Sequence, residues 1–269
     1  MALYTTKLYI ILYKIHPKTL FVGQILQYLP SCQSTNDEAS VLIAQIDPNE
    51  GLVVITDNQT AGRGQRGNQW EAKAGENLTF SLILKPGFLM ATEQFWLNIA
   101  VSLGIYDALQ PLVGPSLRIK WPNDIYVGNQ KLGGILIENT LHGYSIAWSV
   151  VGIGLNVNQI DFGYSTATSL QALAPLPNTY DLPGLLSRLC ETLEQRYLQL
   201  LAGQRDTLKI NYLQILYRFQ QEHRFESEGQ SFRGTIIGID PHGRLAIQVN
   251  GQIRYFAFKE VSFDIEGRS

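Results

Sequence analysis

The stretch Gln59-Thr-Ala-Gly-Arg-Gly-Gln-Arg-Gly-Asn-Gln-Trp70 decides how this chain is interpreted, because it combines a permissive backbone with fixed positive charge. It follows an apolar run, residues 51–56, that predicts a buried strand. Its glycines allow close approach to a ligand, and its two arginines carry planar sets of donors for carboxylate and phosphate oxygens. We expect a loop that binds an anionic molecule with a flat part. The alternative is a surface hairpin loop that is merely rich in glycine and arginine.

The spacing Gly62-x-Gly64-x-x-Gly67 also matches the dinucleotide-binding fingerprint, but its surroundings do not. That fingerprint needs a helix that begins at the loop, so that the helix N-terminus receives the pyrophosphate. Here residues 70–75 are too few for a helix and include a glycine, and an apolar run at 77–84 predicts a second strand. The sequence therefore does not predict a βαβ unit at this loop.

Composition describes a globular protein without a large charge bias. The chain has 269 residues, a formal net charge of −2 and 45% hydrophobic residues, which is enough to bury a full core. The small negative charge argues against nucleic acid as the main partner, because nucleic-acid-binding domains usually carry a basic surplus. The two cysteines and four scattered histidines show neither a disulfide framework nor metal-ligand spacing. We expect a cytoplasmic protein.

The ends of the chain show no targeting signal. Residues 1–21 are mildly apolar but are interrupted by Lys7, Lys14 and Lys18, which does not fit a signal peptide. No run of roughly 18 apolar residues occurs, so no membrane span is expected. Residues 265–268, Ile-Glu-Gly-Arg, resemble a protease-site remnant from an expression vector.

The hydrophobic pattern predicts an α+β fold in which a mixed β-sheet carries packed helices. A capped amphipathic helix is expected after Ser34, over residues 39–46. Longer helices are expected at 93–109 and 181–201, and a shorter one at 207–219. The expected strands of the sheet are 51–57, 77–84, 117–121, 124–127, 132–139 and 144–153.

From residue 222 the sequence changes to short strands and turns. Asp240-Pro-His-Gly243 and Asn250-Gly251 are hairpin signals that separate three apolar runs, at 235–239, 245–249 and 253–256. We therefore expect two domains, a larger one over 1–221 and a small β-barrel over 222–269.

Three polar clusters interrupt the expected central strands. Lys120-Trp-Pro-Asn-Asp124 contains a proline that removes a ladder donor, so the strand must end or bend there. Lys131-Leu-Gly-Gly-Ile-Leu-Ile-Glu138 and Val151-Gly-Ile-Gly-Leu-Asn156 place glycines inside strands, and a common reason is a ligand or backbone that lies close. Each cluster alone fits a structural turn. Together with the glycine–arginine loop they indicate one site on one sheet.

These four motifs, in this order, resemble the signature of biotin–protein ligases, and Ser34-Thr-Asn36 and Gln59 fit the same pattern. The resemblance implies a class II synthetase-like catalytic domain followed by an SH3-like barrel. It also implies a ligase reaction in two steps. Biotin and ATP, with Mg²⁺, form biotinyl-5′-AMP and pyrophosphate. A lysine of the biotin carboxyl carrier protein of acetyl-CoA carboxylase then receives the biotinyl group.

The resemblance also implies roles for individual residues. The expected biotin pocket consists of Ser34, Thr35, Asn36, Gln59, Arg63, Gly64, Gln65, Lys131, Gly133 and Gly134. The expected ATP-binding residues are Arg66, Trp70, Asn123 and Asn156, with Trp70 stacked on the adenine. The expected catalytic residues are Lys131, Arg63 and Asp124. No protein ligand for a metal is expected.

Asp124 has two interpretations. Its carboxylate can orient or deprotonate the acceptor lysine in the second step, because an ammonium must lose a proton before it attacks. Alternatively, Asp124 only holds the bend at Lys120–Trp121.

The chain departs from the family pattern at the loop and at its start. Many family members have basic residues where this chain has Gln65 and Asn68, so the charge of the loop depends more on Arg63 and Arg66. The residues before the first motif suggest strands rather than a helix-turn-helix, which argues against repressor activity and against binding to nucleic acid. A monomer and a homodimer both remain open.

Two other functions are compatible with parts of the sequence. A lipoate- or octanoyl-transferring relative would share the fold but is expected to lack this form of the glycine–arginine loop. A non-catalytic module that recruits a protein through the C-terminal barrel would leave Lys131 and the Lys120–Asp124 cluster without a purpose.

Overall fold

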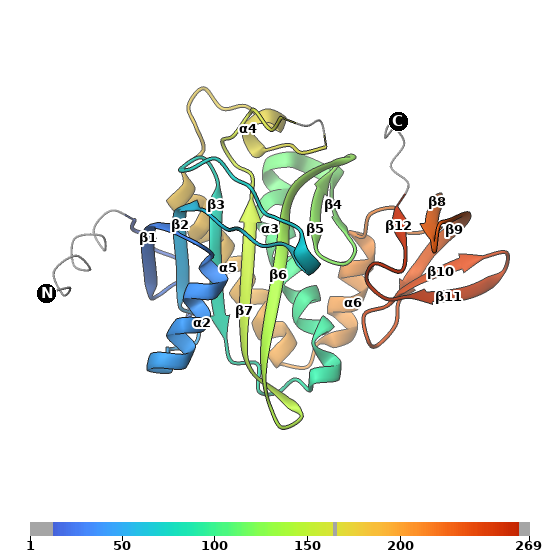
Figure 1. The fold of residues 1–269 in the computed structure, drawn as a ribbon, viewed down its shortest axis with the longest axis horizontal. Coiled ribbons are helices and arrows are strands. Elements are labelled where there is room, and N and C mark those ends of the chain that lie inside the picture. Colours follow the sequence, from blue (N-terminus) through green and yellow to red (C-terminus); the bar gives the residue numbers. More distant parts are fainter. Residues whose placement is uncertain (1–12, 164–165, 264–269) are drawn as a thin grey trace, which may run out of the picture.

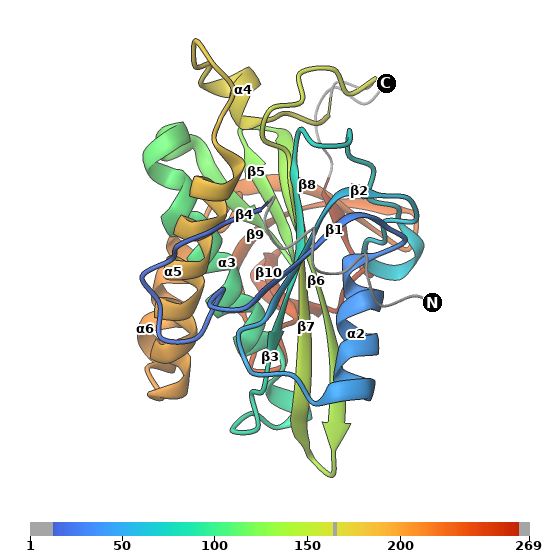
Figure 2. The same ribbon diagram turned by 90° about the vertical axis from the view of Figure 1, so that its left-hand side faces the viewer.

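The computed structural model describes residues 13–163 and 166–263, which form a large sheet with helices on both faces and a smaller sheet beside it (Figure 1; Figure 2). The suggested protease-site remnant at residues 265–268 lies outside the described residues, as do residues 1–12.

The large sheet has seven strands, in the spatial order β1 (Leu26–Cys32), β2 (Val53–Gln59), β3 (Leu78–Leu84), β7 (Ser145–Leu155), β6 (Gln130–His142), β5 (Asp124–Val127) and β4 (Leu117–Lys120). β1 and β2 are parallel and the other neighbouring pairs are antiparallel, which confirms the predicted mixed sheet. β3 is buried at every residue, so the core lies at the centre of the sheet.

The helices cover both faces of this sheet. α2 (Thr35–Ile46) lies on one face, and the opposite face carries α3 (Phe95–Val113), α5 (Leu182–Leu201) and α6 (Arg205–Gln214) (Figure 2). α3 is the central, mostly buried helix. It packs closely against α5, because a Cβ at Gly104 would lie 2.8 Å from the Cα of Leu193. The short α4 (Leu170–Leu173) follows β7 along the chain.

The start of α2 differs from the capped helix that the sequence predicts. The helix begins at Thr35 with Ser34 as its N-cap residue, but the Ser34 side chain makes no capping hydrogen bond. Instead, the backbone N–H of Thr35 donates to Oε1 of Gln59 at the end of β2, at 2.9 Å. A side chain of the sheet thus satisfies a donor that a local cap would otherwise satisfy.

The helix expected over 207–219 ends earlier, at Gln214. The residues that follow pair with the edge strand β4. The backbone N–H of Ile119 donates to the oxygen of Ile215 at 2.9 Å, and that of Tyr217 donates to the oxygen of Ile119 at 2.8 Å. Because an open strand edge offers unpaired backbone groups, this pairing replaces the last turns of the expected helix.

The sequence suggests strands before the first motif, and β1 is one of them, whereas residues 13–25 are irregular. The carboxylate of Glu194 on α5 accepts hydrogen bonds from the backbone N–H groups of Leu20, Phe21 and Val22, at 2.7 to 2.9 Å. A side chain therefore takes the place of a strand partner. From Tyr13 to the start of β1, the described chain contains no helix and hence no helix-turn-helix.

The second sheet has five antiparallel strands, in the order β11 (Gln252–Phe256), β10 (Leu245–Val249), β9 (Gln230–Ile239), β8 (Glu222–Ser227) and β12 (Ser262–Phe263). It has its own buried side chains, among them Phe225, Ile236 and Ile247. This C-terminal unit fits the expected SH3-like barrel and lies beside α6 and the β4–β5 edge of the large sheet (Figure 1). Within the ranges that the structure describes, no helix is long and apolar enough to cross a membrane.

Candidate active site

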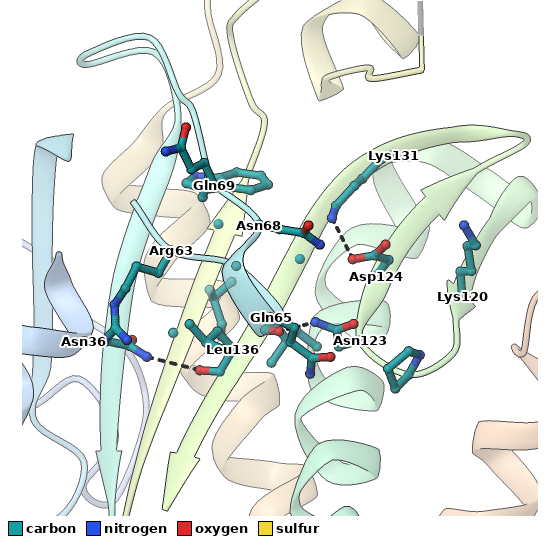
Figure 3. Close-up of a pocket in the computed structure, with 18 of the residues that line it drawn as sticks. Asn36, Arg63, Gln65, Asn68, Gln69, Lys120, Asn123, Asp124, Lys131 and Leu136 are labelled. Carbon is teal, nitrogen blue, oxygen red and sulfur yellow. Dashed lines mark hydrogen bonds and ion pairs between the residues drawn. The ribbon is translucent and has the colours of Figure 1, made fainter. Parts of the chain in front are cut away.

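A cavity of about 510 Å³ opens over the middle of the large sheet, a size typical of small-molecule sites. Residues of β3, β7 and β6 line it, the loop between β2 and β3 crosses it, and the bend between β4 and β5 forms a wall (Figure 3). Its polar side chains gather in two places, which we call the amide end (Ser34, Thr35, Asn36 and Gln59) and the lysine end (Lys120, Asp124 and Lys131).

The amide end is a buried polar network where α2 meets the sheet. Asn36 is 3% exposed, and its Oδ1 accepts a hydrogen bond from the hydroxyl of Ser81 on β3 at 2.6 Å. Its Nδ2 donates to the backbone oxygen of Leu136 at 3.3 Å and to Oε2 of Glu138 at 2.7 Å, both on β6. With both sides of the carboxamide engaged, its orientation is fixed. Such uncharged, oriented groups suit a ligand head that hydrogen-bonds without carrying charge.

The glycines of β7 make room for side chains of the site. A Cβ at Gly152 would lie 2.3 Å from Oδ1 of Asn36, and a Cβ at Gly154 would lie 2.3 Å from the indole of Trp70. The nearest protein atoms at these glycines of β7 are therefore side chains rather than backbone. Both glycines also line the cavity, so the expectation of a ligand close to them stays a prediction. At Gly133 the close neighbour is backbone, as expected, because a Cβ would lie 2.6 Å from the oxygen of Gly154.

The glycine–arginine loop, residues 59–70, folds back on itself between β2 and β3. The backbone N–H of Trp70 donates to the oxygen of Gly62 at 3.0 Å, and that of Gly64 donates to the oxygen of Asn68 at 2.7 Å. A single short 3₁₀ turn, Gln65–Gly67, interrupts the loop before β3 begins. The absence of a helix after this loop confirms that the dinucleotide fingerprint does not apply.

Arg63 fastens this loop to the rim of the cavity. Its Nη2 lies 2.5 Å from Oδ1 of Asp37 on α2, and its Nη1 lies 3.0 Å from Oε1 of Glu138 on β6. We call these two ion pairs the arginine clasp. All three side chains are more than one third exposed, and exposed ion pairs contribute only about 0–1 kcal/mol each. The clasp therefore holds the loop weakly enough for a ligand to change it.

At the lysine end, Nζ of Lys131 lies 2.7 Å from Oδ1 of Asp124 (Figure 3). The pair lies close above Gly134, where a Cβ would come within 3.4 Å of Nζ and 3.5 Å of Oδ1. The backbone of Lys131 is held on its other side, because its N–H donates to the oxygen of Thr166 at 2.8 Å and its oxygen accepts from Thr168 at 2.9 Å. A fixed cation thus faces the cavity with a carboxylate that an anionic ligand can displace.

The bend between β4 and β5 sets the position of Asp124. Asn123 is 8% exposed, its Nδ2 donates to the oxygen of Ile135 at 2.5 Å, and its backbone oxygen accepts from the N–H of Ile135 at 3.0 Å. On the other side, Nδ2 of Asn98 on α3 donates to the oxygen of Pro122 at 2.6 Å. Asn123 therefore ties the bend to β6, which places the next residue beside Lys131.

The structure brings together most of the site residues expected from the sequence. The cavity is lined by Ser34, Thr35, Asn36, Gln59, Arg63, Gly64, Gln65, Trp70, Asn123, Asp124, Lys131 and Gly134. Gly133 and Asn156 do not belong to this lining. Asn156 is 4% exposed, and its Nδ2 donates to the oxygen of Thr168 at 3.0 Å, so it holds the segment after β7. The side chain of Arg66 lies outside the described residues.

Sequence reasoning missed one wall of the cavity. The C-terminal unit contributes Phe258, Lys259, Val261, Ser262 and Phe263. Lys120, for which the sequence predicted no role of its own, also lines the cavity. Its Nζ lies 4.7 Å from the ring centroid of Tyr126 and 5.3 Å from that of Phe263. No motif marks the segment 258–263, because an aromatic-rich strand and turn would be expected in any small β-domain.

Known proteins share this fold and these motifs. Residues 28–156 match the Biotin/lipoate A/B protein ligase family, and residues 222–264 match the Biotin protein ligase C terminal domain. The mixed sheet with its cavity and the small C-terminal unit therefore define a protein-modifying ligase.

Relatives narrow this class further. The chain is 31% identical over 255 residues to the bifunctional ligase/repressor BirA of Bacillus subtilis. This alignment covers 93% of this chain and 76% of that protein. It is 30% identical to the biotin--[acetyl-CoA-carboxylase] ligase of Mycobacterium tuberculosis over 81% of each chain. The fold resembles that of the biotin protein ligase from Aquifex aeolicus in complex with biotin and ATP, with a TM-score of 0.73 at 23% identity over 89% of this chain and 98% of that one. This chain belongs to the biotin–protein ligase family.

Proposed function

We propose that this chain activates biotin with ATP and transfers the biotinyl group to a lysine of the biotin carboxyl carrier protein of acetyl-CoA carboxylase. One observation carries the proposal: a single cavity joins an uncharged amide end to a positively charged lysine end. Biotin has the matching polarity, with a neutral ureido ring at one end and a carboxylate at the other. The relatives named for biotin and acetyl-CoA carboxylase support the same substrates.

The first step joins two anions, so the site must supply positive charge. A carboxylate oxygen of biotin attacks the α-phosphorus of ATP, the bond from that phosphorus to the bridging oxygen breaks, and pyrophosphate leaves. Lys131 stabilises the charge that develops on the phosphate, and Arg63 adds a second cation from the loop. The indole of Trp70, which lies against Gly154 in the cavity wall, offers a flat surface to the adenine.

Mg²⁺ fits this site as an ion held mainly by the substrate. In the described part of the chain, no group of three or more His, Cys, Asp or Glu side chains could hold a metal. Asp124 is the only carboxylate among the described lining residues. One carboxylate together with substrate phosphates is a common Mg²⁺ environment. When bound, the ion would offset phosphate charge.

The second step needs a neutral lysine amine. The acceptor nitrogen attacks the acyl carbon of biotinyl-5′-AMP, the bond from that carbon to the phosphate oxygen breaks, and AMP leaves. We propose that Asp124 is the general base that accepts the proton lost by the acceptor ammonium. Its side chain is 25% exposed and is directed to Lys131 rather than to the backbone of the bend, which favours this role over a purely structural one.

A lipoate-transferring relative is the alternative with the same fold. The dithiolane ring of lipoate has no hydrogen-bond donor and only weakly accepting sulfur atoms, so it would gain little from the oriented polar groups of the amide end, whereas a ureido ring both donates and accepts. The amide end therefore favours biotin.

We further propose that the domains divide at residues 1–221 and 222–269, and that the reaction takes place in the cytoplasm. Both a monomer and a homodimer are compatible with a cavity that one chain lines by itself.

Biotin-dependent exchange between ATP and pyrophosphate tests the function directly. We expect exchange with biotin, little competition by lipoate, and transfer of labelled biotin to a purified carrier domain. A carrier domain with its acceptor lysine changed to arginine is the matched control and should stay unlabelled. Exchange that depends on lipoate instead, or no exchange with either acid, would overturn the proposal.

A further inference from the structure

The C-terminal unit is fixed against the wall of the cavity at Trp121. The indole Nε1 of Trp121 donates to the backbone oxygen of Gly243 at 2.9 Å, and the ring of Phe258 meets the indole edge-on, 6.3 Å between centroids. At Gly243 a Cβ would lie 2.3 Å from the ring of Phe95 on α3, so the turn packs tightly against the large domain. These contacts hold the segment 257–263 in place beside the lysine end.

Lys259 occupies a turn of this segment in a conformation that favours glycine. Its φ is 71°, in the left-handed region that L side chains rarely adopt. The turn is closed by Glu260, whose N–H donates to the oxygen of Ala257 at 3.0 Å and whose Oε2 accepts from the N–H of Ala257 at 2.7 Å. The neighbouring carboxylate is thus directed to the backbone, whereas Lys259 lines the cavity. A lysine in a backbone conformation that favours glycine points to a use for its side chain.

The charge of the cavity is opposite to that of the chain. The net charge of the chain is −2, yet the described lining contains one carboxylate, Asp124, and the cations Arg63, Lys120, Lys131 and Lys259. Arg63 is held by the arginine clasp at the far rim, so the positive surplus is greatest at the lysine end. A cleft with a surplus of lysines attracts polyphosphates.

We propose that, in this chain, Lys259 binds the terminal phosphates of ATP. This inference rests on the biotin-activating function proposed above and deepens it. Lys131 lies on a strand of the large sheet, next to Asp124, where the α-phosphate reacts. Lys259 approaches from the opposite domain and is exposed, which suits the β- and γ-phosphates. When the bond between the α-phosphorus and the bridging oxygen breaks, the electron pair stays with pyrophosphate. The ammonium group of Lys259 stabilises this negative charge.

Glycine at position 259 provides a clean test, because it removes the ammonium group and fits the left-handed backbone. We expect Lys259→Gly to raise the KM for ATP about ten-fold in biotin-dependent exchange, the loss of one charge-assisted contact. The KM for biotin should stay unchanged, and Lys259→Arg should keep most of the ATP affinity. Arg233→Ala is the matched control, since it removes a 74% exposed cation of the same unit outside the cavity and should change neither constant.

Inorganic tripolyphosphate and adenosine separate the phosphate contact from the rest of the nucleotide. In calorimetry without biotin, Lys259→Gly should bind tripolyphosphate about ten-fold more weakly and adenosine as the wild type does. If the variant keeps its KM for ATP and its tripolyphosphate affinity while the wild type exchanges pyrophosphate, the role of Lys259 is wrong and the function stands. If the wild type does not exchange, the function fails, and a preserved or lost tripolyphosphate affinity still decides the role of Lys259.

Discussion

The amide end of the cavity is held by buried hydrogen bonds, whereas the lysine end keeps its charges in contacts that water can reach. Asn36 is 3% exposed and bonds to two strands at once. The side chains of Lys131 and Asp124 are 35% and 25% exposed. A missing partner is costly where groups are buried, while solvent screens an ion pair that it reaches.

This difference suggests separate tasks for the two ends. A ligand at the amide end meets groups that are already oriented, which lowers the ordering cost of recognition. An anionic ligand at the lysine end can displace Asp124 from Lys131, so the cation becomes available as the anion arrives. We therefore expect changes at the amide end to lower stability and biotin affinity together. Changes at the lysine end should lower rates and leave stability nearly intact.

The largest effect is expected for Lys131→Ala. Losing one preorganised group that stabilises developing charge typically lowers a rate by about 10²–10³, and we expect that loss in adenylate formation. The melting temperature should stay close to that of the wild type, because the ion pair with Asp124 is partly exposed. Rapid-quench measurement of a single turnover tests the rate, with Lys209→Ala on α6 as the control. Near-normal adenylation by the variant would remove Lys131 from the catalytic group.

Asp124→Asn should affect the other step of the reaction. We expect adenylate formation to persist and transfer to the carrier lysine to slow by about 10², as for the loss of a general base. The two steps can be timed separately with purified biotinyl-5′-AMP. If only adenylation slows, Asp124 belongs with ATP and its metal. If neither step slows, Asp124 has only the structural role at the bend.

Asn36→Ala tests the amide end. The substitution removes the hydrogen bonds of Asn36 to Ser81 and Glu138, although Ser81 keeps Thr35 as a partner. We expect a loss of about 1–3 kcal/mol in the free energy of unfolding. The KM for biotin should rise about ten-fold, and the KM for ATP should change little. Urea denaturation and substrate titrations measure both, with Gln45→Ala at an exposed position of α2 as the control. Lost biotin affinity without lost stability would contradict the preorganised network.

The smallest effect concerns the arginine clasp. Glu138→Gln keeps an acceptor for Asn36 but removes a charge that holds Arg63. Because an exposed pair contributes about 0–1 kcal/mol, amide hydrogen exchange of residues 59–70 should rise by at most about five-fold.

Biotin plus ATP should protect this loop in the wild type and in Glu138→Gln alike, since the ligand supplies new contacts. Equal exchange with and without ligand would contradict a loop that orders over the cavity. Glu226→Gln, a change in the second sheet, is the matched control and should leave the loop unchanged.

Much of the fold follows from local sequence patterns. Apolar patterns located the central helix and most strands of both sheets, because burial of one face imposes the period. They gave no bounds for β1, β8 and β12. The helix expected to 219 shows the limit of local patterns. Its last residues are not helical, because Ile215 and Tyr217 pair with Ile119 on an open strand edge. The cap expected from Ser34 shows the same limit, because Gln59 supplied the acceptor from another element.

For the site, the sequence determined which segments carry chemistry. The glycine–arginine loop, the Lys120–Asp124 bend and the Lys131–Glu138 strand could be recognised because glycine, proline and charge within a strand are local departures from regular structure. Those motifs are enough to indicate the family from the sequence alone.

Only the tertiary structure decided which groups meet. It placed Asn36 and Trp70 over the glycines of β7, paired Arg63 with two carboxylates from other elements, and brought Lys259 from the C-terminal unit to the cavity. These contacts join residues far apart in the chain, and their geometry depends on how sheets and helices pack. A sequence pattern records the local backbone preference of each residue, whereas the partner across a cavity is set by the fold as a whole.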